Sequence, residues 1–212
     1  PEYTIAYTGN YTTSADANIR NSPGRLLFPI LLVGSTGSIL IYYPAYEFGF
    51  VLKEQHLASS FLVGGMTSAI GVGAILGASA LASLGQLSPL KGASICLLSA
   101  CAGQLGVALA QSHILLILAA LVTGIGQGLF VPTLSQWLLG SVLESARGRS
   151  IAIFQTVLLI SQFSAPQLSR IAASTFGSAA GGMTTLGTVS GLCAVLLLLS
   201  SFRLNVASDG SR

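Results

Sequence analysis

Long uncharged apolar runs alternate with short polar segments along the chain. Six runs approach or exceed the roughly 20 residues that a helix needs to cross a bilayer. They lie at about 26–46, 58–84, 92–111, 114–140, 150–170 and 182–202. Between Lys91 and Glu144 the sequence contains no Asp, Glu, Lys or Arg. The pattern therefore predicts an all-α membrane protein with six transmembrane helices.

Composition supports a chain surrounded by lipid. Of 212 residues, 52% are hydrophobic and only 7% are charged, whereas about a quarter of a soluble domain is charged. So few charges cannot cover a water-exposed surface, and the lipid bilayer is the first expected partner. The net charge of +3 is spread out, and because no basic stripe exists, a nucleic acid partner is not expected.

Lysine and arginine predict the orientation of the spans. The six-helix domain spans residues 25–205, between a polar linker or tail at 1–24 and a short tail at 206–212. Because the number of spans is even, both tails lie on the same side of the membrane. That side carries seven basic residues, against Lys53 and Arg170 on the other. The seven are Arg20, Arg25, Lys91, Arg147, Arg149, Arg203 and Arg212. The bias predicts that both termini are cytoplasmic. The expected location of the protein is the plasma (inner) membrane. The start at Pro1, without a signal peptide, indicates a processed end or part of a longer chain.

The stretch "GIGQGLFVPTLSQW", residues 124–137, raises a choice between a phosphate loop and a helix contact. Leu129 follows the third glycine, no Walker Lys-Ser/Thr is present, and the flanks are uncharged, so phosphate binding is not favoured. Small residues four apart let membrane helices approach closely. Such pairs occur at Gly73/Gly77, Gly124/Gly128, Gly177/Gly181 and Gly187/Gly191. Prolines within the spans, Pro29, Pro44, Pro132 and Pro166, are expected to bend their helices.

Catalytic chemistry is not indicated. The three cysteines, Cys96, Cys101 and Cys193, lie in apolar runs without metal or redox spacing, so packing roles are expected. An intramembrane serine protease needs a serine and a histidine within the spans, but His56 and His113 are at loop positions. A water channel would show Asn-Pro-Ala half-helices, and no Asn-Pro occurs. We therefore expect no enzyme, no cofactor and no metal.

Three segments resemble the major facilitator superfamily. "ESARGRSIAIFQTVLLISQFSAPQL" resembles the loop between helices ten and eleven and helix eleven itself. "GIGQGLFVPTLSQWL" resembles helix ten. "YPAYEFGFVLKEQHLASSFLVGGMTSAIGVGAILGASAL" resembles the end of helix seven, the outer loop and helix eight. The similarity runs in order over about residues 25–205 and implies the C-terminal half of a twelve-helix fold, closest to drug and sugar efflux permeases.

The resemblance carries one departure in the cytoplasmic loops. Leu81 stands four residues after Gly77, where the family often has an acid, so a charge-locked gate at that loop is doubtful. Glu144 and Arg147 are expected to form a charged pair at the next cytoplasmic loop, with Arg149 beside it. The alternative is that Arg147 and Arg149 only anchor the topology.

The resemblance also implies that spans one, two, four and five line a central cavity. On those spans the candidate substrate-binding residues are Tyr42, Tyr46, Gln127, Gln155 and Gln162, a wall that suits neutral or amphipathic ligands. An equal alternative for the amides is that they hydrogen-bond neighbouring helices. The alternative for the tyrosines is that they belong to the aromatic belt at the membrane interface. Arg170 and Glu47 are placed near outer ends where they can reach water, so this half shows no proton carrier.

These observations predict the C-terminal half of a secondary active transporter that exports a small molecule by alternating access, completed by an N-terminal six-helix half in the parent chain. A non-transporting structural or accessory six-helix subunit is the alternative. Six further helices upstream would favour transport.

The orientation is testable by labelling single cysteines in intact cells. A membrane-impermeant thiol reagent is expected to modify Lys53→Cys and Ser178→Cys, because both positions lie outside. Ser88→Cys and Ser145→Cys serve as the inside controls. Labelling at these two positions, with Lys53→Cys and Ser178→Cys protected, would reverse the topology.

Overall fold

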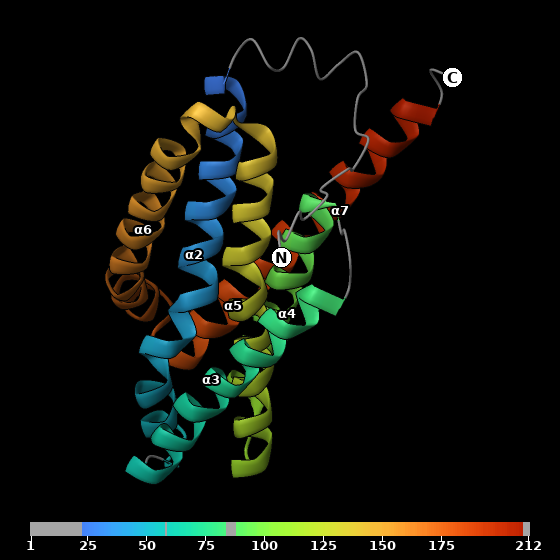
Figure 1. Cartoon of the computed structure of the whole chain (residues 1–212). Coiled ribbons are helices and arrows are strands. Elements are labelled where there is room, and N and C mark those ends of the chain that lie inside the picture. Colours follow the sequence, from blue (N-terminus) through green and yellow to red (C-terminus); the bar gives the residue numbers. More distant parts are fainter. Residues whose placement is uncertain (1–22, 58, 84–87, 210–212) are drawn as a thin grey trace, which may run out of the picture.

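The structure, a computed structural model, describes residues 23–57, 59–83 and 88–209. The described part consists of helices joined by short connections (Figure 1). The helices are α2 (Pro23–Glu54), α3 (Ser60–Ser83), α4 (Pro89–Leu109), α5 (His113–Ser141), α6 (Arg147–Phe176) and α7 (Ala179–Asp209), with a single 3-10 turn, η1 (Glu144–Ala146), before α6.

Six of these helices are long and apolar enough to cross a membrane. The prediction of an all-helical chain with six candidate transmembrane helices is therefore confirmed for the described residues. The helices exceed several predicted spans: α2 continues from 46 to Glu54 and α7 reaches Asp209, so the predicted tail at 206 begins inside a helix. Residues 1–22 of the predicted linker, and residues 210–212, lie outside the described part.

A local motif, and not the first charge, ends α2. The Leu57 amide donates to the Leu52 carbonyl at 2.9 Å and the His56 amide donates to the Lys53 carbonyl at 3.2 Å. This is the Schellman pattern, which needs a left-handed residue after the helix, and His56 has φ of 58°. The helix therefore passes Glu47 and continues for about two more turns.

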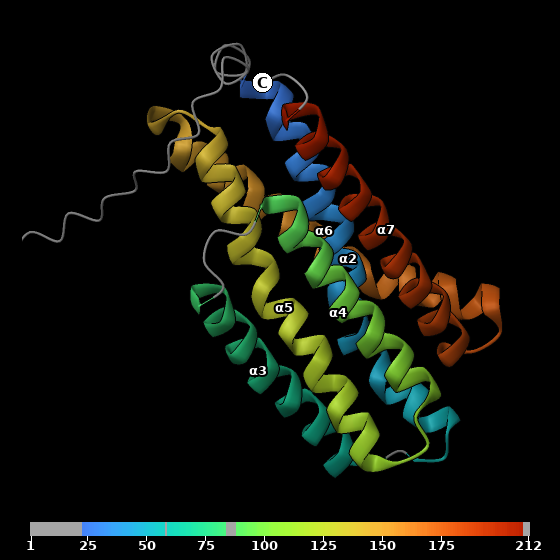
Figure 2. The same cartoon turned by 90° about the vertical axis from the view of Figure 1, so that its right-hand side faces the viewer.

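Helices far apart in the sequence pack against each other. α3 lies along α5, α6 lies along α2, and α4 fits between α5 and α7 (Figure 2). α2 also contacts α4, α5 and α7. The first three helices and the last three are thus interleaved, because each set supplies neighbours to the other.

Glycines bring α3 and α5 into backbone contact. Added methyl groups at Gly73 and Gly77 would overlap the carbonyl oxygens of Leu121 and Ile125. The contact is reciprocal, since methyl groups at Gly124 and Gly128 would overlap the carbonyl oxygens of Ile70 and Ala74. The structure thus places the first two glycine pairs at one interface, that of α3 with α5.

The two glycine pairs near α7 differ from each other. Gly187 and Gly191 face α4, where a methyl group would lie 3.2 Å from Gln104 Cβ and 2.9 Å from Cys101 Sγ, respectively. Gly177 instead ends α6 with φ of 74° and has open space around it. The spacing of Gly177 and Gly181 therefore does not mark a helix contact, because Gly177 supplies a left-handed helix end.

Alanine substitution separates packing glycines from ordinary ones. Gly128→Ala is expected to lower the free energy of unfolding by about 1–3 kcal/mol, because the added methyl group forces two backbones apart. Gly71→Ala, on α3 with open space around it, is the matched control, and helix propensity favours that change by up to about 1 kcal/mol. Thermal unfolding in detergent measures both. Equal destabilisation of the two variants would contradict the contact.

Candidate functional site

The centre of the bundle is organised by a proline in α2. Pro44 has no N–H, so the Leu40 carbonyl four residues earlier loses its helical donor. Gln104 of α4 donates its amide to that carbonyl at 2.6 Å. Gln127 of α5 donates its amide to the next carbonyl, of Ile41, at 3.1 Å. Two glutamines from other helices therefore hydrogen-bond adjacent carbonyls within the bend of α2.

Gln104 was not among the residues that the sequence singled out, and the structure shows that it is fully buried. A signal existed: a proline inside a membrane helix leaves a carbonyl that another helix must satisfy. Gln127, a candidate for substrate binding, uses its amide nitrogen to bind α2. This contact is the alternative role weighed for the amides, that of joining neighbouring helices.

The tyrosines of α2 lie at different depths. Tyr42 is half-buried against the core, and Tyr46, one turn later on the same side of the helix, is 45% exposed. Ser38, one turn before Tyr42, is buried, and its hydroxyl makes no hydrogen bond with the described residues. This side of α2 therefore passes from the core to the surface of the bundle.

The α6 amides lie on the outer part of the bundle. Gln155 is exposed and Gln162 is half-buried. Their separation of seven positions places both on one side of the helix. Within the described residues, neither side chain makes a hydrogen bond with Gln127 or with α2. Both amides remain open to lipid, water or another protein surface.

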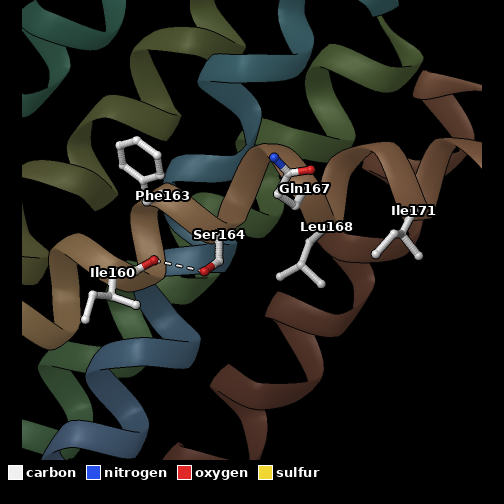
Figure 3. A pocket seen from close by; sticks show the side chains of 6 residues that line it. All are labelled: Ile160, Phe163, Ser164, Gln167, Leu168 and Ile171. Atoms are coloured by element: carbon white, nitrogen blue, oxygen red, sulfur yellow. Dashed lines mark hydrogen bonds between the residues drawn. The ribbon is translucent and has the colours of Figure 1, made fainter.

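A shallow groove follows a separate strip of α6 (Figure 3). Its volume is about 580 Å³, and it is open to the surface. Its lining is mostly apolar, and the Ser164 hydroxyl donates to the Ile160 carbonyl at 2.9 Å. The lining residues are Ile160, Phe163, Ser164, Gln167, Leu168 and Ile171. One helix supplies the whole lining, so the groove is an open strip on the surface of α6 and not an enclosed cavity.

Pro29 also lies within α2, and two of the prolines singled out lie in neighbouring helices. Pro132 is within α5 and Pro166 is within α6, each half-buried. Each withdraws one N–H from its helix. Three neighbouring helices, α2, α5 and α6, thus carry an internal proline.

At the loop before α6, Arg147 Nη1 lies 3.3 Å from Glu144 Oε1. Both side chains are exposed, at 45% and 87%, so the pair contributes at most about 1 kcal/mol. Arg149 is exposed beside it. The expected charged pair is present, but its exposure means that water competes for both groups.

Glu47 differs from its expected position. Only 3% of its surface is exposed, and the expectation that it reaches water at a span end is wrong. The reason is the length of α2: the helix continues to Glu54, so Glu47 lies inside the packed part of the span.

The end of α2 serves two other helices. The Glu54 carboxylate accepts hydrogen bonds from the Ala179 amide at 2.7 Å and the Ala180 amide at 3.0 Å, at the start of α7. The Gln55 amide donates to the Val107 and Ala108 carbonyls, at 3.3 and 3.2 Å, near the end of α4. Negative charge at a helix start and a donor at a helix end both complement the helix dipole.

Comparison of the chain with known protein families, with curated proteins and with solved structures finds no match. The class of the protein is therefore inferred from its fold. It is a multi-pass helical protein with six candidate transmembrane helices, whose buried amides pair with backbone groups of neighbouring helices.

A double-mutant cycle tests the pairing of Gln104 with the bend. Gln104→Leu is expected to lower the free energy of unfolding by about 1–3 kcal/mol, because it leaves the Leu40 carbonyl buried without a donor. In a Pro44→Ala background the N–H at position 44 can reach that carbonyl, so the loss should shrink by about 0.5 kcal/mol or more. Thermal or denaturant unfolding in detergent gives the four stabilities. An equal loss of unfolding free energy in both backgrounds would mean that Gln104 does not replace the helical hydrogen bond that Pro44 removes.

Proposed function

We propose that this chain forms the C-terminal six-helix half of a secondary active transporter of the major facilitator type, exporting a neutral or amphipathic small molecule by alternating access. The packing order of the helices is the observation that carries the proposal. The resemblance of the α5, α6 and α2–α3 sequences adds to it.

The packing order is partly symmetric between two triplets, although the contacts of α2 with α4 and of α6 with α7 have no counterpart in it. If α2, α3 and α4 are exchanged with α5, α6 and α7, the contact of α3 with α5 becomes the contact of α6 with α2. The contact of α4 with α5 likewise becomes that of α7 with α2, and both pairs are present. Three is an odd number of spans, so the second triplet would cross the membrane in the opposite direction to the first. Inverted repeats of this kind are typical of transporter halves.

The distribution of polar side chains supports a cavity wall. Tyr46, Gln155 and the α6 groove are open on the outside of the bundle. In lipid, exposed amides on a helix are unfavourable unless protein or water meets them. A second six-helix half placed against the exposed face of α6 would supply that partner for Gln155 and would cover the groove.

The proposal is tested in the full-length parent, whose reading frame is expected to encode six more spans upstream of Pro1. Expressed in bacteria that lack their own efflux pumps, the parent should lower the accumulation of at least one fluorescent amphipathic dye. Gln155→Leu or Gln162→Leu should weaken apparent affinity by roughly two- to tenfold, the loss of one hydrogen bond of about 0.5–1.5 kcal/mol. Rates are normalised to surface protein.

Leu159→Ala, an exposed change on the same stretch of α6, is the matched control and should leave affinity unchanged. A structural amide would give less surface protein with unchanged affinity. A parent that is folded at the surface but moves no dye of a broad panel, or that has no upstream spans, would favour the accessory-subunit alternative.

A further inference from the structure

Glu47 stands apart from the other acidic side chains that the structure describes. Glu54 and Glu144 are exposed residues, whereas Glu47 is 3% exposed and lies within a candidate membrane span. Nothing in the proposed cavity wall uses it. An ionisable group within a membrane span is costly and is usually functional.

The surroundings of Glu47 are defined by its strip of α2. Tyr43, Glu47 and Glu54 lie within about 40° of one another on the helix, because they are four and seven residues apart. The hydroxyl of Tyr43 lies 3.0 Å from the position of a Cβ on Gly182. Glu54 binds the Ala179 amide. The strip therefore faces the start of α7, with apolar Met183 in the same cluster as Tyr43.

No cation neutralises Glu47 within the described residues. The ion pair found there joins Arg147 to Glu144, so no described Lys, Arg or His nitrogen lies within 4.0 Å of the Glu47 carboxylate. Arg170 of α6 is exposed, and His113 is the ionisable side chain at the start of α5. The first turns of α7, the last turn of α4 and all of α3 have no titratable side chain.

The two carboxylates near α7 are treated differently by the structure. The Glu54 carboxylate accepts hydrogen bonds from two backbone N–H groups at a helix start. Glu47 receives no hydrogen bond from a described residue, and an unpaired carboxylate in apolar surroundings is costly unless it is neutralised. The Tyr43 hydroxyl, also buried and without a hydrogen-bond partner in the described part, is the nearest polar group along the strip.

We propose that Glu47 is a proton-binding site within the contact of α2 with α7, with the Tyr43 hydroxyl beside it. A proton adds to a carboxylate oxygen and makes the site neutral, which suits the apolar packing. Loss of the proton leaves two negative charges two turns apart on α2, where they repel each other.

In the full-length parent, a proton-binding site at Glu47 would make the proton the ion that drives transport. Entry of a proton to Glu47 would be exchanged for exit of substrate, and this part of the inference rests on the proposed function. The site itself does not, since it belongs to the six helices described.

The site is tested on the chain itself, in lipid bilayers, with dicyclohexylcarbodiimide. This apolar reagent adds to a protonated carboxyl group within the membrane, and the adduct is the sum of the two molecules. Peptide mass spectrometry over about pH 5 to 9 should find the adduct at Glu47, falling roughly tenfold per pH unit above the midpoint. Exposed Glu144 is the internal control and should stay unmodified, and Glu47→Gln should lose the adduct.

Tyr43→Phe should shift the midpoint of labelling, because it removes the hydroxyl one turn from Glu47 on the same strip; an unchanged midpoint would remove Tyr43 from the site. An unlabelled Glu47 in folded chain, or labelling that ignores pH, would overturn proton binding. Protection by Na⁺ at constant pH would instead make the site one for a metal cation.

Coupling is tested separately in the parent. Glu47→Gln should abolish efflux driven by a pH gradient while retaining substrate exchange at equilibrium, and Glu144→Gln should retain both. Gradient-driven efflux by Glu47→Gln at the unaltered rate would overturn coupling. A parent without any transport would refute the proposed function and leave the labelling result standing.

Discussion

In a bilayer every backbone polar group must find its partner inside the protein, and the arrangement of α2 follows from this constraint. Pro44 withdraws one donor from the helix, and the carbonyls of Leu40 and Ile41 take amides from α4 and α5 instead. At the end of the helix, Glu54 and Gln55 serve the unpaired backbone groups of α7 and α4. Side-chain hydrogen bonds thus tie α2 to three helices, through groups that regular helices would have satisfied alone.

The interface of α3 with α5 is of the opposite kind. There the glycines let carbonyl oxygens approach the facing backbone directly, and no side chain can rearrange to absorb a displacement. Close packing of this sort is stiff. An amide that donates to a freed carbonyl can rotate and find water or a different acceptor. Of the two interfaces, the surroundings of the α2 bend are therefore the more adaptable.

The sequence predicted the spans and the glycine contacts, because long apolar runs and small residues four apart carry their meaning locally. It did not predict the roles of Gln104 and Glu47. Membrane helices are apolar on nearly every side, so hydrophobic periodicity does not reveal which side faces protein. Gln104 acquires its role only because Pro44, 60 residues away, presents a free carbonyl at the same depth. Glu47 resembled the end of a span, since the Schellman motif at His56, which sets the true end, has neither the usual Gly nor Asn.

The interleaving of the two triplets limits what can move. α3 of the first triplet is locked to α5 of the second, and α4 lies between α5 and α7. Separating the triplets would break the backbone contacts at Gly73, Gly77, Gly124 and Gly128, which lie in the stiffest interface. A large rearrangement within the bundle is therefore disfavoured, and the six helices are expected to move as one body. If the proposed alternating access is correct, it requires a second body, and the exposed face of α6 with its groove is one surface that such a body would cover.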